Sequence, residues 1–386
     1  MTRALVAGVG MTRFGKFPER SLADLGREAV LGALDDAGIE GSQVQIAYAG
    51  HARTGRLHGR ENGVGQLVLW ESGIRDIPIT GVGNFCASGS SAFREAVFAV
   101  LTGIYDIALA VGIEKLSSRA ERGRPLTSDG MELEGEFGFT PPAFFAMAAK
   151  AYMAETGTTP EMLAAVAVKN RRHASQNPYA QYRELITVED VLAAPMIAEP
   201  FTRLSCCPTG DGAAAAVVVS EAAAQRLGMK RLVRVLATSL TSGGYRVGPL
   251  GWFDIDRRAA RAAYEMAGVD PRDIDIAEVH DAFTATEIIH YEDLMLCRRG
   301  EGGRLVADGE TALGGRIPVS TSGGLLSKGH PLGATGVAQV HEVVTQLRGE
   351  AGPRQVEGAR TGLTHCVGGF LDGDAASSCV HILQKN

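Results

Sequence analysis

Apolar and polar residues fall into two recurring patterns along the chain. Residues 22–37 and 257–267 carry apolar side chains at helical spacing, which predicts amphipathic helices. Residues 107–112 and 213–219 are short, continuous apolar runs, which are typical of strands buried on both faces of a sheet. Because such strands alternate with helices, the pattern predicts an α/β fold.

The same order of elements occurs twice. The sequence Ala-Gly-Ile at 37–39, followed by an apolar strand at 46–49, returns as Ala-Gly-Val at 267–269 followed by a strand at 276–279. In both copies a glycine stands where an amphipathic helix stops, as is common at helix C-termini. The equal spacing of the segments in the two copies indicates an internal duplication.

The duplication divides the chain into two halves, which we expect to span residues 1–235 and 236–386. They differ mainly in one insertion, at about 116–208, which has no counterpart in the second half. We expect this block to fold over one face of the molecule as a lid. Its aromatic residues fit either a substrate pocket or a packed helical core: Phe139, Phe144, Phe145 and Tyr152.

Composition and charge exclude several classes of function. The chain has 386 residues, 45% of them hydrophobic, which is enough for two core-forming units. Its 38 basic and 44 acidic residues give a net charge of −6, which disfavours broad binding to nucleic acid or to anionic membranes. No apolar stretch approaches the roughly 20 residues that a membrane span needs. The six cysteines show neither metal-binding nor disulfide spacing, so a cytoplasmic location fits best.

Cys86 is the first candidate for chemistry. It lies in Asn-Phe-Cys-Ala-Ser-Gly-Ser at 84–90, directly before a predicted helix that reaches Leu101. A helix N-terminus favours the thiolate form of cysteine, and the small residues leave the backbone free to approach a ligand. Isolated cysteines are more often packing residues, as we expect of Cys206 and Cys207. The setting of Cys86 favours a nucleophile.

Three further residues stand in settings suited to acid–base chemistry. His330 follows paired glycines and precedes Pro331, which we expect at the first helical position, so its imidazole can take the thiol proton. His280 ends a predicted strand, where α/β proteins place ligand-contacting side chains. Cys366 lies in a glycine-flanked turn, again just after a strand. Each also fits a capping or packing role, and their combination favours catalysis.

These residues and their order resemble the thiolases, and in particular the lipid-transfer-type branch of that family. The segment at 84–92 matches the position of the acylated cysteine, and the sequences at 280–283 and 329–331 match the family's His-Asp-x-Phe and Gly-His-Pro motifs. The resemblance covers essentially the whole chain. It implies a five-layered αβαβα fold, usually dimeric, that binds coenzyme A as substrate or product without a tightly bound cofactor or a metal.

The resemblance also implies a role for each residue. Cys86 is expected to be the acylated nucleophile, His330 its activator and first oxyanion donor, and Cys366 the group that exchanges a proton with the substrate carbon. His280 is expected to assist from the oxyanion side through a water molecule. The backbone amides of Cys86 and Gly368 are candidates for a second oxyanion hole. Contacts to coenzyme A are expected from three small residues, Ser322, Gly323 and Gly324.

One position departs from the branch. Many of its members carry a second cysteine within the His-Asp-x-Phe motif, where this chain has Ala282. Cys366, by contrast, lies in a Cys-x-Gly context that resembles conventional thiolases. The chain therefore combines features of two branches.

Three alternatives stay open at this point. Some lipid-transfer-type relatives are retro-aldolases that act on β-hydroxyacyl-CoA, but these characteristically lack the nucleophilic cysteine. A decarboxylating ketosynthase also pairs a cysteine with two histidines. A non-catalytic acyl-CoA-binding subunit would not need the four reactive residues together. Some relatives work with a small OB-fold, zinc-ribbon partner protein, which makes such a partner a further expectation.

Overall fold

The computed structural model describes residues 3–59, 62–117, 140–244, 248–371 and 374–386. Within these ranges the chain forms a mixed nine-stranded sheet in the order β3-β2-β4-β7-β1-β8-β11-β10-β9, with a separate short pair, β5 and β6. The strands are β1 (Ala4–Met11), β2 (Ile46–Gly50), β3 (Ile79–Val82), β4 (Ile107–Lys115), β5 (Met196–Ala198), β6 (Phe201–Thr202), β7 (Asp211–Ser220), β8 (Val233–Ser242), β9 (Ile276–Glu278), β10 (Thr361–Leu371) and β11 (Asp374–Lys385).

The two halves of the chain contribute strands in the same order, outward from the centre of the sheet. β1 and β8 lie side by side at this centre. From β1 the order runs outward through β7, β4 and β2, and from β8 it runs through β11, β10 and β9. In both halves the outer pair, β2 with β4 or β9 with β10, is parallel, and the inner neighbours are antiparallel. These equivalent orders confirm the internal duplication.

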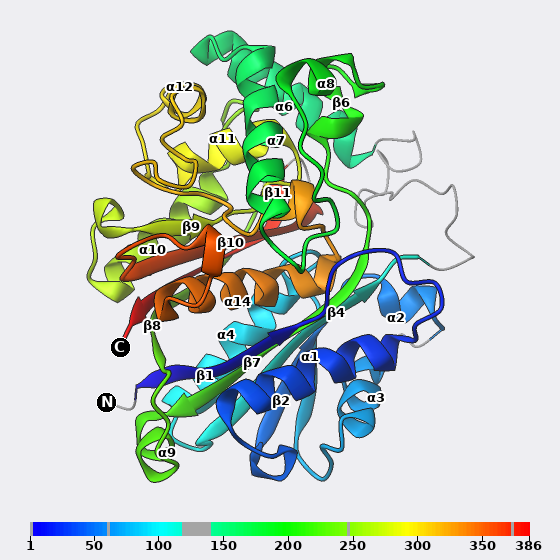
Figure 1. Cartoon of the computed structure of the whole chain (residues 1–386), viewed down its shortest axis with the longest axis vertical. Coiled ribbons are helices and arrows are strands. Elements are labelled where there is room, and N and C mark those ends of the chain that lie inside the picture. The colour runs from blue at the N-terminus through cyan, green and yellow to red at the C-terminus, as the bar shows by residue number, and fades with distance from the viewer. Residues whose placement is uncertain (1–2, 60–61, 118–139, 245–247, 372–373) are drawn as a thin grey trace.

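Helices form three layers around the two halves of the sheet (Figure 1). α1 and α3 cover the outer face of the first half, α10 covers the second with α11 beside it, and α4 and α14 lie between and contact strands of both. This arrangement confirms the five-layered αβαβα fold. No helix in the described part of the chain is long and apolar enough to cross a membrane. The helices are α1 (Leu22–Ala37), α2 (Thr54–Leu57), α3 (Val64–Glu71), α4 (Ser88–Leu101), α6 (Pro141–Thr156), α7 (Pro160–Ser175), α8 (Val188–Ala193), α9 (Glu221–Arg226), α10 (Asp254–Ala267), α11 (Thr284–Asp293), α12 (Gly302–Ala307), α13 (Gly324–Ser327) and α14 (Thr335–Arg348).

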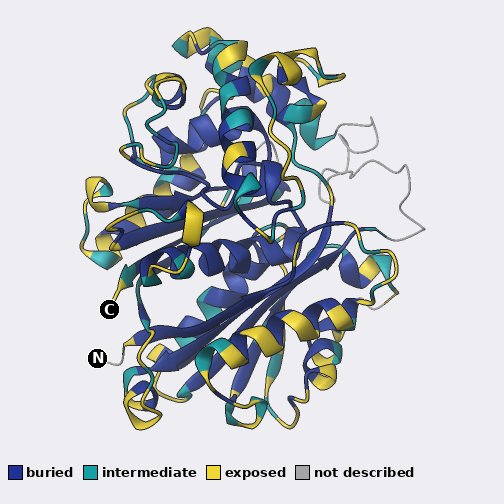
Figure 2. Ribbon diagram, viewed as in Figure 1, coloured by how far each residue is buried: buried dark blue, intermediate teal, exposed yellow. Residues whose placement is uncertain are grey.

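The middle layer is the most deeply buried (Figure 2), and its packing depends on glycine. A Cβ atom on Gly89 of α4 or on Gly112 of β4 would lie 2.3 or 2.4 Å from the carbonyl oxygen of Gly333. Because neither glycine has a side chain, the loop that precedes α14 can pack directly against the helix that follows Cys86. The small residues seen in the sequence therefore bring the two halves of the site together.

Of the block at about 116–208, expected to form a lid, the helices described after residue 139 lie against the second half of the chain (Figure 1). Its helices α6 and α7 pack on α11, and α7 also packs on α12 and α13. Phe144, Phe145 and Tyr152 belong to the hydrophobic core of this half. Phe139 lies outside the described residues. The aromatic residues of the insertion thus contribute to packing, and one of them also lines the cavity described below.

Two elements near the site differ from those expected. The long helix α14 begins at Thr335 and not at Pro331, because a separate 3-10 turn, η5 (Leu332–Ala334), comes between them. Cys366 lies inside β10 and not in a turn after it, since β10 stays paired with β11 beyond this residue. The glycine that suggested a turn, Gly368, instead allows the strand to approach Asn84, whose carbonyl oxygen would lie 2.2 Å from a Cβ at this position.

Candidate active site

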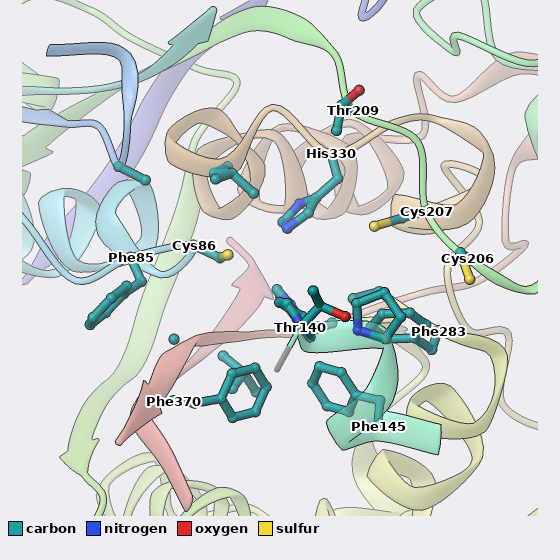
Figure 3. Close-up of a pocket in the computed structure, with 18 of the residues that line it drawn as sticks. Phe85, Cys86, Thr140, Phe145, Cys206, Cys207, Thr209, Phe283, His330 and Phe370 are labelled. Carbon is teal, nitrogen blue, oxygen red and sulfur yellow. The ribbon is translucent and has the colours of Figure 1, made fainter. Parts of the chain in front are cut away.

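Cys86 lies on a tight turn between β3 and α4. The Ser88 hydroxyl accepts the Asn84 amide at 2.9 Å and donates to the Phe85 carbonyl oxygen at 2.6 Å. Phe85 has a positive φ of 50°, which is uncommon for a large side chain. These contacts fix the backbone on both sides of Cys86, whose sulfur points into the cavity in Figure 3.

The hydroxyl group of Thr335 holds the His330 ring in place, and it donates its own hydrogen to a backbone carbonyl oxygen. Thr335 Oγ1 lies 2.8 Å from His330 Nδ1 and donates to the Pro331 carbonyl oxygen at 3.1 Å. Because a hydroxyl carries one hydrogen and the carbonyl can only accept it, Nδ1 of His330 must donate to Thr335. The other ring nitrogen, Nε2, is then unprotonated, which is the tautomer that a general base requires.

His280 and Cys366 form a second pair beside Cys86. The Cys366 sulfur lies 3.6 Å from His280 Nδ1 and donates to the Cys86 carbonyl oxygen at 3.3 Å. The Cys366 side chain is completely buried, and His280, not Cys366, lines the cavity. A proton that moves between Cys366 and a group in the cavity therefore has to pass through His280.

The structure brings residues from three distant segments to one point. The Cys86 sulfur and one ring nitrogen each of His280 and His330 all lie within 4.8 Å of one another. The two imidazole rings meet edge to face, with their centroids 5.2 Å apart. A small reacting group placed between them would contact the nucleophile and both bases.

Desolvation favours the uncharged form of all three groups. Burial, followed by the nearby Glu114 carboxylate, raises the pKa of the Cys86 thiol to about 12, although the Gly369 amide acts to lower it. Burial also lowers the pKa of His330 to about 3 and that of His280 well below its usual range. The raised pKa disfavours the resting thiolate expected from the sequence, because α4 begins only at Ser88 and desolvation outweighs the helix dipole. The thiol must lose its proton as it attacks.

Glu114 is a buried carboxylate that the sequence patterns did not point to. Its oxygens accept the backbone amides of residues 52–54, and of Gly333 at 3.0 Å. These hydrogen bonds join the loop after β2 to the loop that carries His330. Burial raises the pKa of Glu114 to about 6, although the amides favour its ionised form. The signal that could have identified it is a glutamate at the end of an apolar strand.

These residues open onto a cavity of about 800 Å³ (Figure 3). Cys206 and Cys207, expected to be packing residues, pack against the core and also line the cavity. Phe145 of the insertion lines it as well, whereas Phe144 and Tyr152 do not. The walls beyond the nucleophile are mainly apolar and include four aromatic rings: Phe85, Phe145, Phe283 and Phe370.

Two neighbouring glycines of β10, Gly368 and Gly369, lie differently with respect to the cavity and Cys86. Gly369 lines the cavity, and its backbone amide acts to lower the pKa of the Cys86 thiol. Gly368 packs against the Asn84 carbonyl and does not line the cavity. Gly369 has a positive φ of 59°, so the regular strand geometry is interrupted at this point of β10, which the sequence motif did not reveal.

The three residues expected to contact coenzyme A do not line the cavity. The amide and hydroxyl of Ser322 donate to the Glu278 carboxylate at 2.9 and 2.6 Å. Gly323 and Gly324 have positive φ angles, and a Cβ on Gly324 would lie 2.0 Å from an Asp281 oxygen. All three are buried, and Gly324 begins α13.

Side chains that could hold a metal ion converge at two places in the described ranges. One is the set of Cys86, His280 and His330. In the other, Asp256 lies 3.0 Å from His365 and 3.4 Å from His290, fully buried. The first set already has the geometry of a nucleophile and two bases, and the second that of a histidine–carboxylate cluster.

Comparisons with known proteins give matches over nearly the whole chain. Residues 4–222 match the family model described as "Thiolase, N-terminal domain", and residues 252–385 match "Thiolase C-terminal domain-like". An acetyl-CoA acetyltransferase of Methanothermobacter thermautotrophicus is 42% identical and is covered over 100% of both chains. The benzoylsuccinyl-CoA thiolase subunit BbsB of Thauera aromatica is 39% identical, covering 95% of each chain. A solved structure named "Ltp2-ChsH2(DUF35) aldolase" superposes with a TM-score of 0.83 at 29% identity, covering 99% of this chain and 98% of that chain.

Proposed function

The chain belongs to the thiolase family of acyl-CoA C-acyltransferases, and we propose that Cys86 carries the acyl group while a 3-oxoacyl-CoA is cleaved or formed. The observation that carries this proposal is the convergence of the Cys86 sulfur with the neutral imidazoles of His280 and His330 beside an apolar cavity. Coenzyme A is then substrate or product, and this chemistry uses no tightly bound cofactor.

In the cleavage direction, the first half-reaction transfers the acyl group to Cys86. The thiol proton passes to Nε2 of His330 as the sulfur attacks the C3 ketone. The C2–C3 bond then breaks, its electron pair moves to C2 to form the enolate of acetyl-CoA, and a thioester remains on Cys86. The amides of Cys86 and Gly369 are placed to donate to the oxyanion at C3.

The enolate takes up a proton at C2, and we assign its source to Cys366 acting through His280. The imidazole gives the proton on Nε2 to C2 while Nδ1, 3.6 Å from the Cys366 sulfur, takes the thiol proton. In the second half-reaction coenzyme A attacks the thioester on Cys86. Its thiol proton returns to Cys366, and protonated His330 restores the Cys86 thiol.

A retro-aldolase acting on a β-hydroxyacyl-CoA is the second candidate, because the solved structure described above is named an aldolase. That reaction forms no acyl-enzyme and has no use for a cysteine at this point. The central position of Cys86 favours the thiolase reaction.

We further propose a homodimer and a partner subunit. β3 is the edge strand of the sheet, and its exposed residues Thr80 and Gly81 leave backbone groups available to a second copy. A small OB-fold, zinc-ribbon partner is supported by one relative being named a subunit and by DUF35 in the name of the solved structure. The six free cysteines suit a reducing compartment such as the cytoplasm.

The reaction is tested by incubating the protein with a panel of 3-oxoacyl-CoA thioesters, with and without coenzyme A and with and without the proteins of neighbouring genes. We expect coenzyme A-dependent release of acetyl-CoA and a shortened acyl-CoA. Cleavage of β-hydroxyacyl-CoA to a carbonyl compound, without consumption of coenzyme A, would support the aldolase instead.

The tautomer of His330 predicts the effect of replacing Thr335 by valine. Valine keeps the shape of the side chain but cannot accept from Nδ1, so less of the imidazole presents an unprotonated Nε2. We expect acylation by a simple acyl-CoA to slow by about 10- to 100-fold, part of the 10²–10⁴ that a whole acid–base group supplies. Thr335→Ser should recover most of the rate, which a purely packing role would not predict.

The pKa values predict a simple pH profile for acylation. The pKa values of Cys86 and His330 lie far from neutrality. The pKa of Glu114 is about 6, so Glu114 is the one of these three groups that changes charge near neutral pH. Its ionised form is the better acceptor for the Gly333 amide, so kcat/KM should fall as the pH drops below about 6 and stay level above it. In Glu114→Gln this inflection should vanish and the rate stay low. An inflection that survives would belong to the substrate.

A further inference from the structure

We infer that the acyl group accepted by this site ends in an aromatic ring, so that the substrates are aryl or arylalkyl 3-oxoacyl-CoA thioesters. This inference rests on the proposed function, since it specifies what Cys86 carries. It comes from the arrangement of phenylalanine rings in the cavity and behind it.

Three rings form the wall of the cavity that faces His330 (Figure 3). Phe145 comes from α6, Phe370 from β10, and Phe283 directly precedes α11. The Phe145 centroid lies 4.7 Å from that of Phe283 and 4.9 Å from that of Phe370. These are contact distances for tilted and edge-to-face rings, so the three residues, called here the aromatic floor, form one continuous surface.

A second tier of rings closes the space behind the aromatic floor. Phe144 lies 4.5 Å from Phe370, Phe201 stacks on Phe283 at 5.1 Å, and Phe253 lies 6.2 Å from Phe145. The three rings of this tier are buried, and none of them lines the cavity. These packed rings fill the space behind the floor, so an acyl chain that reaches the floor has to end or bend there. A compact, flat group needs no space behind the floor.

The aromatic floor matches a substrate ring in its chemistry and also in its shape. Ala198, Ala282 and Val367 also line this cavity and are apolar, and the polar side chain labelled beside the floor in Figure 3 is Thr140. A phenyl ring against the floor makes the same tilted and edge-to-face contacts that its members make with each other. An alkyl chain with equally many carbons gains burial but not these contacts.

The test compares two substrates that have the same number of carbons and the same surroundings of the ketone, 3-oxo-5-phenylpentanoyl-CoA and 3-oxoundecanoyl-CoA. We expect the parent protein to cleave the phenyl substrate with a kcat/KM about 10-fold higher or more, within the 10–200-fold range of pocket discrimination. Phe145→Leu and Phe370→Leu should each reduce this ratio by about 10-fold. Phe93→Leu, the same change at a buried ring of another core cluster, should leave it unchanged.

A second readout separates this inference from the proposed function. Acylation of Cys86 by 3-phenylpropanoyl-CoA and by nonanoyl-CoA, followed by intact-protein mass spectrometry, tests the ring preference without carbon–carbon cleavage. Preference for the straight chain in either assay, or an unchanged ratio in both floor variants, overturns the inference while the thiolase mechanism stands. Absence of an acyl adduct with both thioesters would overturn the two together.

Discussion

Replacing Cys86 by alanine is expected to lower 3-oxoacyl-CoA turnover by about 10⁶-fold, the scale of loss when a covalent enzyme is deprived of its nucleophile. His330 and the cavity remain, but no atom is left to carry the acyl group between the two half-reactions. The turn around Cys86 is held by Ser88 and by backbone groups, so the fold should persist. Steady-state rates of coenzyme A-dependent cleavage, with the circular dichroism of both proteins, measure the effect.

The matched control is Cys297→Ala, the same change at a half-buried thiol that does not line the cavity. This variant should retain a rate close to that of the parent. If Cys86→Ala also turned over at a rate near the parent's, the nucleophile would have to be sought at Cys206 or Cys207, or the reaction would not be covalent.

Replacing Cys366 by alanine is expected to separate the two kinds of chemistry in the cycle. Acylation of Cys86 by a simple acyl-CoA needs only Cys86 and His330 and should proceed at nearly the parent rate. Carbon–carbon cleavage also needs a proton at C2 and should fall by roughly 10²–10⁴-fold, as is typical when one acid–base group is lost. Rapid-quench acylation and steady-state cleavage of a 3-oxoacyl-CoA give the two rates.

Cys379→Ala is the control for this variant, because Cys379 is a buried cysteine that stands opposite Cys366 in the register of the paired strands β10 and β11. It should affect both rates equally or not at all. If Cys366→Ala cleaves at the parent rate, Cys366 is a packing residue, and the proton carrier has to be sought at His280, at His365 or in the insertion.

The fold was predictable because its elements follow from local pattern and from duplication. The helix at 22–37 was predicted with the bounds that α1 has, since Gly38 stops it in a left-handed conformation with φ of 68°. The buried strands β4 and β7 contain the runs at 107–112 and 213–219. By contrast, the glycines after Cys366 suggested a turn, although Gly368 serves close packing within a strand. Glycine has both uses, and only the tertiary contact decides between them.

The candidate site was predictable in its reactive residues but not in their environment. Motif order identified Cys86, His280 and His330, whose reactive atoms meet within 4.8 Å. The position before a helix predicted a thiolate at Cys86, but desolvation in the cavity raises the pKa of the thiol instead, and desolvation cannot be read from neighbouring residues in the sequence. Glu114 was missed because its partners are backbone amides of distant loops.

Mass spectrometry of the acyl-enzyme tests directly whether Cys86 carries the acyl group. The parent protein is mixed with a 3-oxoacyl-CoA in the absence of free coenzyme A, quenched in acid and digested. We expect a mass increase equal to the shortened acyl group, located on the peptide that contains Cys86, and its disappearance when coenzyme A is added. Cleavage of the substrate without an adduct, or with the adduct on another residue, would contradict this expectation.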